Sequence, residues 1–153
     1  MKEFTVVIPE GKYSVVDFIQ KGFPGVAFIN IALRDFEPKI VFAWHLSLMI
    51  DFEDLIENGM PSRGEREIVD EFEKQIGALL KGTDPEKPNA IFLARITWNE
   101  TRELIWRIYE PARANDILQE IINQNSSPRP FDFRMDDDRE WKLAEWHLSD
   151  HKK

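Results

Sequence analysis

The stretch IVFAWHLSLMI, residues 40–50, decides the predicted fold, because large apolar residues occupy every second position in it. A period of two residues is that of a β-strand, whose successive side chains point to opposite faces. The residues between them are mixed in character. The pattern therefore predicts a long strand, with one wholly apolar face against the core that consists of Ile40, Phe42, Trp44, Leu46, Leu48 and Ile50.

Further strands are predicted upstream of this stretch. Residues 26–33 also alternate, and residues 4–8 and 13–19 are rich in β-branched and aromatic side chains. The turn composition of residues 21–25 would fold residues 13–19 back onto the strand that follows. The segment from residue 13 to residue 20 could also form a short helix, and both interpretations stay open here.

Two helices are predicted downstream. Ser62 and Glu65 have the spacing of a capping box, and apolar residues then recur at three- and four-residue steps until Gly82. Pro111 stands at a favourable first helical position and opens the second helix. A final short helix is expected near the C-terminus, where Asp137-x-x-Glu140 has a capping arrangement that would turn three apolar residues inward: Trp141, Ala144 and Leu148.

A hairpin is predicted between the two helices, with strands over residues 90–98 and 103–109. A two-residue turn at Asn99-Glu100 would place Ile96 opposite Glu103 and mix the apolar and polar faces. We therefore expect a three-residue turn or a bulge, with Ile96 opposite Leu104.

From residue 40 onward the predicted order is strand, helix, strand, strand, helix, strand, which is typical of a ferredoxin-like split βαβ sandwich in the α+β class. We expect a single domain over residues 1–153, in which residues 1–38 add N-terminal strands to the antiparallel sheet. Residues 39–153 form the ferredoxin-like unit with its short C-terminal helix. Two helices cover one sheet face, so we expect the other face to be solvated, paired with a second subunit, or used for binding.

Composition limits the function classes. The chain has 153 residues, 42% of them hydrophobic, a net charge of −8 and no cysteine. These values predict one folded domain and exclude disulfides, thiolate metal sites and a cysteine nucleophile. Excess negative charge disfavours nucleic acid as a partner. Without a signal peptide or membrane span in the sequence, we expect a cytoplasmic protein and no membrane partner.

Chemical motifs are sparse. Gly-rich phosphate loops and the nucleophile elbow are absent from the sequence. Three consecutive carboxylates at residues 136–138 diverge too much for a cation and are better explained as a helix start. His147 and His151 have the spacing of two metal ligands but stand at a chain end that tends to fray. We expect no metal and no cofactor.

The best candidate site lies on the predicted hairpin. Arg95 and Arg107 would be diagonal neighbours on its non-core face, where two guanidinium groups could hold a carboxylate or phosphate. His45 would belong to the same face, and Tyr109 ends the second hairpin strand. The alternative is that these arginines pair with Glu103 or other carboxylates on a wet sheet or at a dimer seam.

The chain from residue 29 onward resembles the DUF695 family, a group of uncharacterised and mainly bacterial domains. The resemblance rests on short motifs, which are residues 30–35, 59–62, 94–97 with Asn99, 102–109 and 138–141. It implies no particular activity.

Three hypotheses follow. The first is a non-catalytic binding or regulatory domain that forms a homodimer, or binds a protein partner, through the uncovered sheet face. The second is a small anionic-ligand site or weak enzyme around Arg95, Arg107 and His45. The third is an acidic inhibitor that competes with nucleic acid for a basic protein surface.

Overall fold

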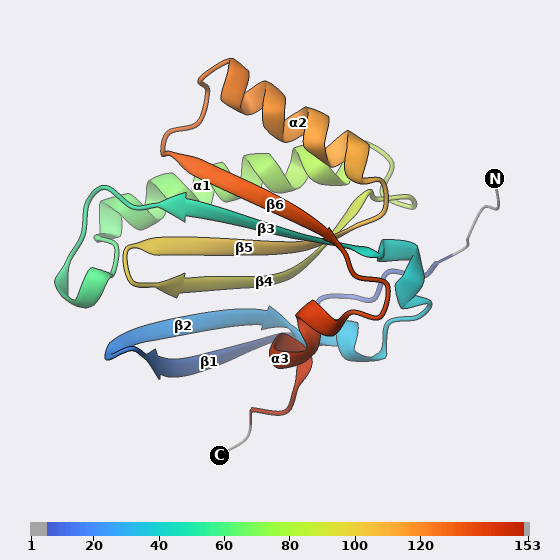
Figure 1. The fold of residues 1–153 in the computed structure, drawn as a ribbon, viewed down its shortest axis with the longest axis horizontal. Coiled ribbons are helices and arrows are strands. Elements are labelled where there is room, and N and C mark those ends of the chain that lie inside the picture. Colours follow the sequence, from blue (N-terminus) through green and yellow to red (C-terminus); the bar gives the residue numbers. More distant parts are fainter. Residues whose placement is uncertain (1–5, 152–153) are drawn as a thin grey trace.

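The computed structural model describes residues 6–151, which form a six-stranded antiparallel sheet with three α-helices (Figure 1). The strands are β1 (Tyr13–Gln20), β2 (Phe23–Asn30), β3 (Trp44–Asp51), β4 (Ala90–Trp98), β5 (Thr101–Ile108) and β6 (Phe131–Asp137). The helices are α1 (Arg63–Lys81), α2 (Pro111–Asn123) and α3 (Glu145–Leu148), and short 3-10 helices cover Ile31–Asp35, Lys39–Phe42, Glu57–Gly59 and Lys142–Ala144. The predicted α+β class is confirmed.

The strand order is β1-β2-β4-β5-β3-β6. It differs from the order of a four-stranded ferredoxin-like sheet, because β1 and β2 extend the sheet beside β4. None of the helices formed by residues 6–151 is long and apolar enough to cross a membrane.

The predicted starts of the first two helices are confirmed, but the predicted cap at Asp137-x-x-Glu140 is wrong, because a 3-10 helix begins at Lys142 and α3 at Glu145, both without a side-chain cap. Ser62 caps α1, since its Oγ accepts the Glu65 N–H at 3.2 Å, and Pro111 is the first residue of α2. The second half of the capping box is not formed. The Glu65 carboxylate instead accepts the Glu53 N–H at 2.8 Å and two hydrogen bonds from the Arg129 guanidinium at 2.7 and 2.6 Å. The buried Glu65 carboxylate therefore links α1 to the segment that precedes β6.

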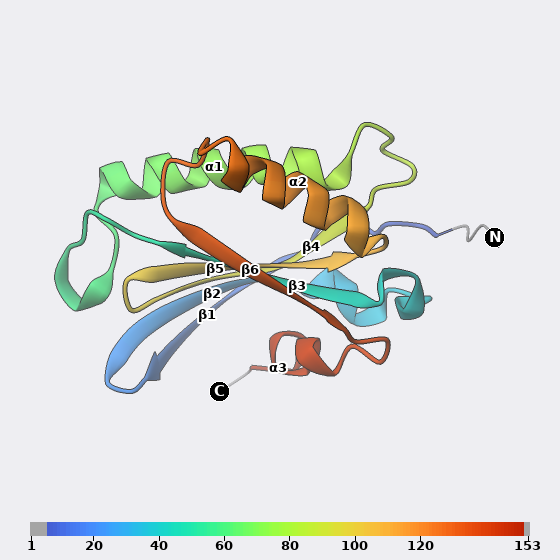
Figure 2. The ribbon, with the colours of Figure 1, turned by 45° about the horizontal axis from the view of Figure 1, so that its top comes forward.

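Helices α1 and α2 cover one face of the sheet (Figure 2). The alternation of residues 46, 48 and 50 is confirmed on this side, because Leu46, Leu48 and Ile50 are completely buried. Apolar residues of both helices pack onto them. This first core also contains Val69, Phe72, Ile76, Leu80, Leu104, Trp106, Ile108, Ala114 and Leu118.

The start of the long predicted strand is wrong. Lys39–Phe42 is a 3-10 helix and β3 begins at Trp44, so Ile40 is exposed and Phe42 turns to the opposite side of the sheet. Long-range side chains satisfy this segment's carbonyl groups, because Trp141 Nε1 donates to Lys39 O at 2.9 Å and to Phe42 O at 3.1 Å. Alternation within residues 40–43 could not reveal these partners.

The upstream strands are shifted or shortened. Residues 13–20 form a strand, so the helical alternative is wrong, and the following strand runs from Phe23 to Asn30 rather than from residue 26 to residue 33. The predicted strand at residues 4–8 lies partly outside the described residues, and residues 6–8 are not in a strand.

The hairpin between β4 and β5 closes through two residues, Asn99 and Glu100, which both have positive φ (42° and 71°). Ile96 therefore lies opposite Glu103, and the predicted pairing of Ile96 with Leu104 is wrong. A bulge between Phe92 and Ala94 then shifts the register, so the expected irregularity exists farther along the strand. The bulge returns Phe92 to the helix side, where it packs against the first core.

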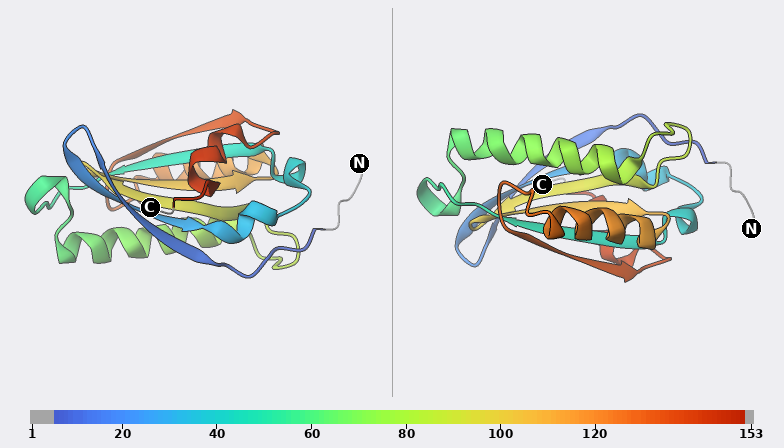
Figure 3. Two further views of the ribbon diagram at one scale, coloured as in Figure 1. Left: turned by 90° about the horizontal axis from the view of Figure 1, so that it is seen from below. Right: turned by 90° about the horizontal axis from the view of Figure 1, so that it is seen from above.

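The face opposite α1 and α2 is covered by the chain itself. Residues 31–43 and the C-terminal residues 138–151, including α3, lie against it (Figure 3). They build a second core that contains Ala27, Ile29, Leu33, Phe36, Val41, Phe42, Ile91, Leu93, Ala94, Ile105, Trp141 and Ala144. The inward placement predicted for Trp141 and Ala144 is confirmed. The expectation that this whole face is uncovered is wrong.

We predict that Arg129→Gln destabilises the protein by roughly 3 kcal/mol, because it leaves the buried Glu65 carboxylate without its cation. The Arg129 hydrogen bonds also lower the pKa of Glu65, so this contribution is present at neutral pH and declines as pH falls into the acid range. Urea unfolding at pH 7 measures the loss. The control is Arg63→Gln, which breaks an exposed ion pair with Glu67 and should cost less than about 0.5 kcal/mol. Equal losses of unfolding free energy in the two variants would contradict the prediction.

Candidate functional site

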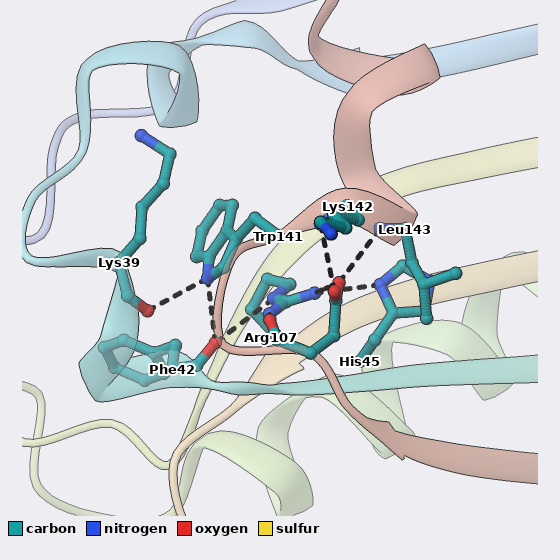
Figure 4. Close-up of polar contacts among 8 residues, drawn as sticks. Lys39, Phe42, His45, Arg107, Trp141, Lys142 and Leu143 are labelled. Atoms are coloured by element: carbon teal, nitrogen blue, oxygen red, sulfur yellow. Dashed lines mark hydrogen bonds and ion pairs between the residues drawn. The ribbon is translucent and has the colours of Figure 1, made fainter.

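The polar cluster in the second core is built around Arg107 on β5, which is completely buried (Figure 4). Its guanidinium donates to Phe42 O at 3.2 Å, to Asp138 Oδ2 at 2.9 Å and to Asp138 O at 2.7 Å. Its Nη1 also lies 3.1 Å from His45 Nδ1. We call Arg107, Asp138, Trp141, His45 and His147 the Arg107 cluster.

Asp138 and Trp141 join this cluster to the C-terminal segment. The Trp141 ring lies 4.4 Å from the Arg107 guanidinium carbon, a cation–π contact. The Asp138 carboxylate also accepts the N–H groups of Lys142 at 2.9 Å and Leu143 at 3.0 Å. Burial alone would raise the pKa of Asp138, but the Arg107 and backbone hydrogen bonds outweigh burial and lower it. The carboxylate is thus charged, and it holds the start of the 3-10 helix Lys142–Ala144.

His45 faces Arg107 directly across the β3–β5 ladder. Arginine can only donate, so His45 Nδ1 must accept and the neutral ring carries its proton on Nε2. Burial, followed by the repulsion of the Arg107 charge, lowers the pKa of His45 to about 4.

His147 of α3 lies next to His45, with ring centroids 6.4 Å apart. Its Nδ1 is buried and has no hydrogen-bond partner among the described residues. Burial lowers the pKa of His147 to about 4 as well. Both imidazoles of the cluster are therefore neutral at physiological pH.

The cluster is closed to a ligand in this structure. Arg107 is fully buried, and its four hydrogen bonds engage Nε, Nη1 and Nη2. His45 and His147 are exposed by only 6% and 9%. Among residues 6–151, no three His, Asp or Glu side chains are grouped so as to hold a metal ion. The Arg107 cluster therefore has a structural role, because it fastens the C-terminal segment to the sheet; we call this set of contacts the clasp.

The predicted site residues are divided between the two faces of the sheet. The structure brings His45 and Arg107 together, as predicted, but Arg95 lies on the helix side. There its guanidinium forms a two-pronged ion pair with Glu73 of α1, so the predicted Arg95–Arg107 clamp is wrong. The two-residue turn is the cause, because it sets Arg95 opposite Leu104 on the helix side, whereas the expected three-residue turn would have set it on the face of Arg107.

Tyr109 lies just after β5 and packs against the second core, with its ring 6.3 Å from that of Phe42. It lines a hollow of about 250 Å³ together with Val41 and Asn89. Neither Arg95 nor Arg107 lines that hollow, so Tyr109 does not share a site with them.

Sequence reasoning missed the roles of Asp138 and Trp141, which complete the cluster. The signal that could have found them is the Asp138-x-x-Trp141 motif, because an acid and an indole near the chain end are suitable partners for a buried arginine. Pattern analysis assigned the acid to helix capping alone.

We predict that Asp138→Ala releases the C-terminal segment, because it leaves the Arg107 charge buried without its carboxylate. Hydrogen exchange should show lost protection over residues 139–151, and unfolding should show a loss of roughly 3 to 5 kcal/mol. Asp136→Ala is the matched control on β6, since its partner Arg134 is exposed. Unchanged exchange over residues 139–151 in Asp138→Ala would refute the role of the clasp.

The two histidines predict an acid-sensitive stability. Each has a folded-state pKa of about 4 against an ordinary value of 6.5, so the unfolded chain binds more protons between these limits. Stability should be full above pH 6.5 and fall as pH drops towards 4, by at most about 3 kcal/mol for each histidine. The measurement is the unfolding free energy across this range. A His45→Gln, His147→Gln double variant should lose most of the slope, and an unchanged slope would contradict the assignment.

The comparisons with known proteins agree with the resemblance noted in the sequence. Neither the curated proteins nor the solved structures contain a match to this chain. A family model, described as a family of unknown function (DUF695), matches residues 19–146. That match covers most of the 153 residues and spans β2 to α3, together with the whole Arg107 cluster except His147. The chain belongs to the DUF695 family.

Proposed function

We propose that the protein is a cytoplasmic, non-catalytic binding or regulatory domain that forms a homodimer through the free edge of β1. The closed Arg107 cluster argues against catalysis there, and the absence of cysteine suits a reducing compartment. The observation that carries the proposal is the difference between the two edges of the sheet.

The edge formed by β6 carries charged side chains. Asp132, Arg134 and Asp136 alternate along it, and Arg134 forms an ion pair with Asp136. Charged side chains on an edge strand oppose pairing with another chain. This edge is therefore unsuited to self-association.

The edge formed by β1 is apolar, and no second strand of residues 6–151 pairs with it. Tyr13, Val15 and Ile19 are 53%, 66% and 79% exposed, and Asp17 is the only charged residue within the strand. The Ile31 N–H donates to Lys12 O, so the alternation of an antiparallel ladder directs the backbone groups of the odd-numbered β1 residues outward. An extended partner could hydrogen-bond to them.

A second copy of the chain fits this edge. In an antiparallel pair about a two-fold axis perpendicular to the sheet, Val16 would face its own copy and Tyr13 would face Ile19 of the partner subunit. In this register the two copies of β1 overlap along their length. The next register with the same hydrogen-bond pattern would place Asp17 directly opposite its own copy, and two like charges in that position repel. The local charge also permits association, since residues 11–21 carry two lysines and one aspartate in an acidic chain.

The ferredoxin-like assignment of residues 39–153, with residues 1–38 as a strand extension, belongs to the same proposal. Its support is that β4, β5, β3 and β6 occupy consecutive places in the sheet. In this proposal the N-terminal extension, residues 1–38, contributes β1, the edge strand through which two copies associate.

We expect light scattering to show a concentration-dependent dimer at tens of micromolar protein, because pairing one strand buries less area than a standard interface. A Val15→Lys, Ile19→Lys double variant should be monomeric at the same concentration. Ile122→Lys, an exposed apolar residue on α2, is the control and should leave the dimer intact. A monomeric parent protein at all concentrations, or an unaffected double variant, would refute the proposal.

The register can be tested separately, since the chain has no cysteine of its own. Even-numbered pairs would be non-hydrogen-bonded, with Cα atoms about 4.5 Å apart, which is within disulfide reach. Val16→Cys should therefore cross-link two copies under mild oxidation. Ser14→Cys, which would face Phe18 of the partner subunit, should not; the reverse result would exclude this pairing.

A further inference from the structure

A groove runs along α1 on the helix side of the sheet, where β1 and β2 extend beyond the cover of that helix. Its volume is about 630 Å³, which lies in the range of small-molecule sites. One wall is α1, from Glu73 to Lys81, and the floor consists of residues from four strands. We call this feature the α1 groove.

The floor of the α1 groove is a row of aromatic rings that crosses the strands. Tyr13, Phe28, Phe92 and Trp106 come from β1, β2, β4 and β5, which are neighbours in the sheet. Successive ring centroids lie 4.7, 6.4 and 5.2 Å apart. Tyr13 is 53% exposed and Phe28 and Phe92 are half-buried, whereas Trp106 is buried beneath Gly77. The row therefore offers three neighbouring apolar rings to the body of a ligand.

Two small residues of α1 line the groove and let the helix pack closely on the sheet. Gly77 faces the Trp106 ring so closely that an added Cβ would lie 2.9 Å from Trp106 Cη2. A glycine within a helix costs about 1 kcal/mol relative to alanine, and here it permits this close approach. Ala78 also lines the groove and is exposed, so α1 sends no bulky side chain over the rings at this point.

Positive charge lines the groove of an otherwise acidic chain. Three cations, Lys74, Lys81 and Arg95, face one carboxylate, Glu73, which is held by Arg95. Neither lysine forms an ion pair with a carboxylate among the described residues; the Lys81 ammonium lies 5.9 Å from the Trp106 ring centroid. Two unpaired ammonium groups thus flank an aromatic surface.

We propose that the α1 groove binds an amphipathic organic anion, with its apolar or aromatic body on the ring row and its carboxylate or sulfonate paired with Lys74 and Lys81. The charge and the aromatic floor recognise the two ends of such a ligand. The proposal does not depend on the dimer, because its lining residues all belong to one chain.

The test uses the fluorescent aromatic sulfonate 1-anilinonaphthalene-8-sulfonate. We expect the folded protein to bind one equivalent with a dissociation constant of tens of micromolar, about −6 kcal/mol. Dodecanoate should compete with it. N-phenyl-1-naphthylamine, which has the same rings without the sulfonate, should bind at least tenfold more weakly.

Two variants locate the binding. A Lys74→Glu, Lys81→Glu double variant should weaken binding of the sulfonate at least tenfold, and Ala78→Leu should do the same by filling the groove. Alanine to leucine at an exposed helix position preserves helix propensity, so Ala78→Leu should remain folded by circular dichroism. Two matched controls on the same helix lie outside the groove lining: Arg66→Glu for charge and Leu79→Ala for apolar surface.

Each outcome decides the proposal. Weakened binding in both groove variants, together with unchanged binding in both controls, supports it. Equal binding in the parent protein and Ala78→Leu, equal affinity for the neutral probe, or no binding to the parent protein would overturn it. The measurement is made on the same samples as light scattering, so loss of the dimer and loss of the ligand are distinguishable.

Discussion

The second layer of this fold depends on one buried charge, the Arg107 guanidinium. A guanidinium without water is costly unless it is paired and hydrogen-bonded, and here Asp138, two backbone carbonyls and His45 meet that requirement. Trp141 covers the charge and donates in turn to carbonyls of residues 39 and 42. The sheet, the segment before β3 and the C-terminal segment are therefore held at a single point.

This arrangement explains how a protein with only two long helices among residues 6–151 buries both faces of its sheet. Helices α1 and α2 cover one face, and the opposite face needs apolar cover from irregular segments. Such segments satisfy few of their own backbone groups, so they depend on side chains brought from elsewhere in the chain. Trp141 and Asp138 perform that role, and they leave the face that we expected to be free unavailable to a partner.

Local patterns predicted most elements because their causes are local. The Ser62 cap, the Pro111 start and the alternation of residues 46–50 each depend on neighbours within a turn or a strand. The failures have long-range causes. The 3-10 helix at residues 39–42 exists where Trp141 donates hydrogen bonds to two of its carbonyl groups, and no periodicity within residues 40–50 contains that information.

The candidate site shows the same limit in one residue. His45 and Arg107 could be placed together from strand alternation, but Arg95 could not. The β4 bulge breaks the alternation from which the hairpin register was inferred, and the two-residue turn sets Arg95 on the helix side. On the helix side Arg95 neutralises Glu73, and nearby Arg102 pairs with Asp70. These pairs use the carboxylates of α1 that face the sheet and leave Lys74 and Lys81 without carboxylate partners among the described residues. Internal pairing of acids thus leaves a basic, aromatic surface on an acidic protein, and this surface, beside the edge of β1, is the one that we propose for ligand binding.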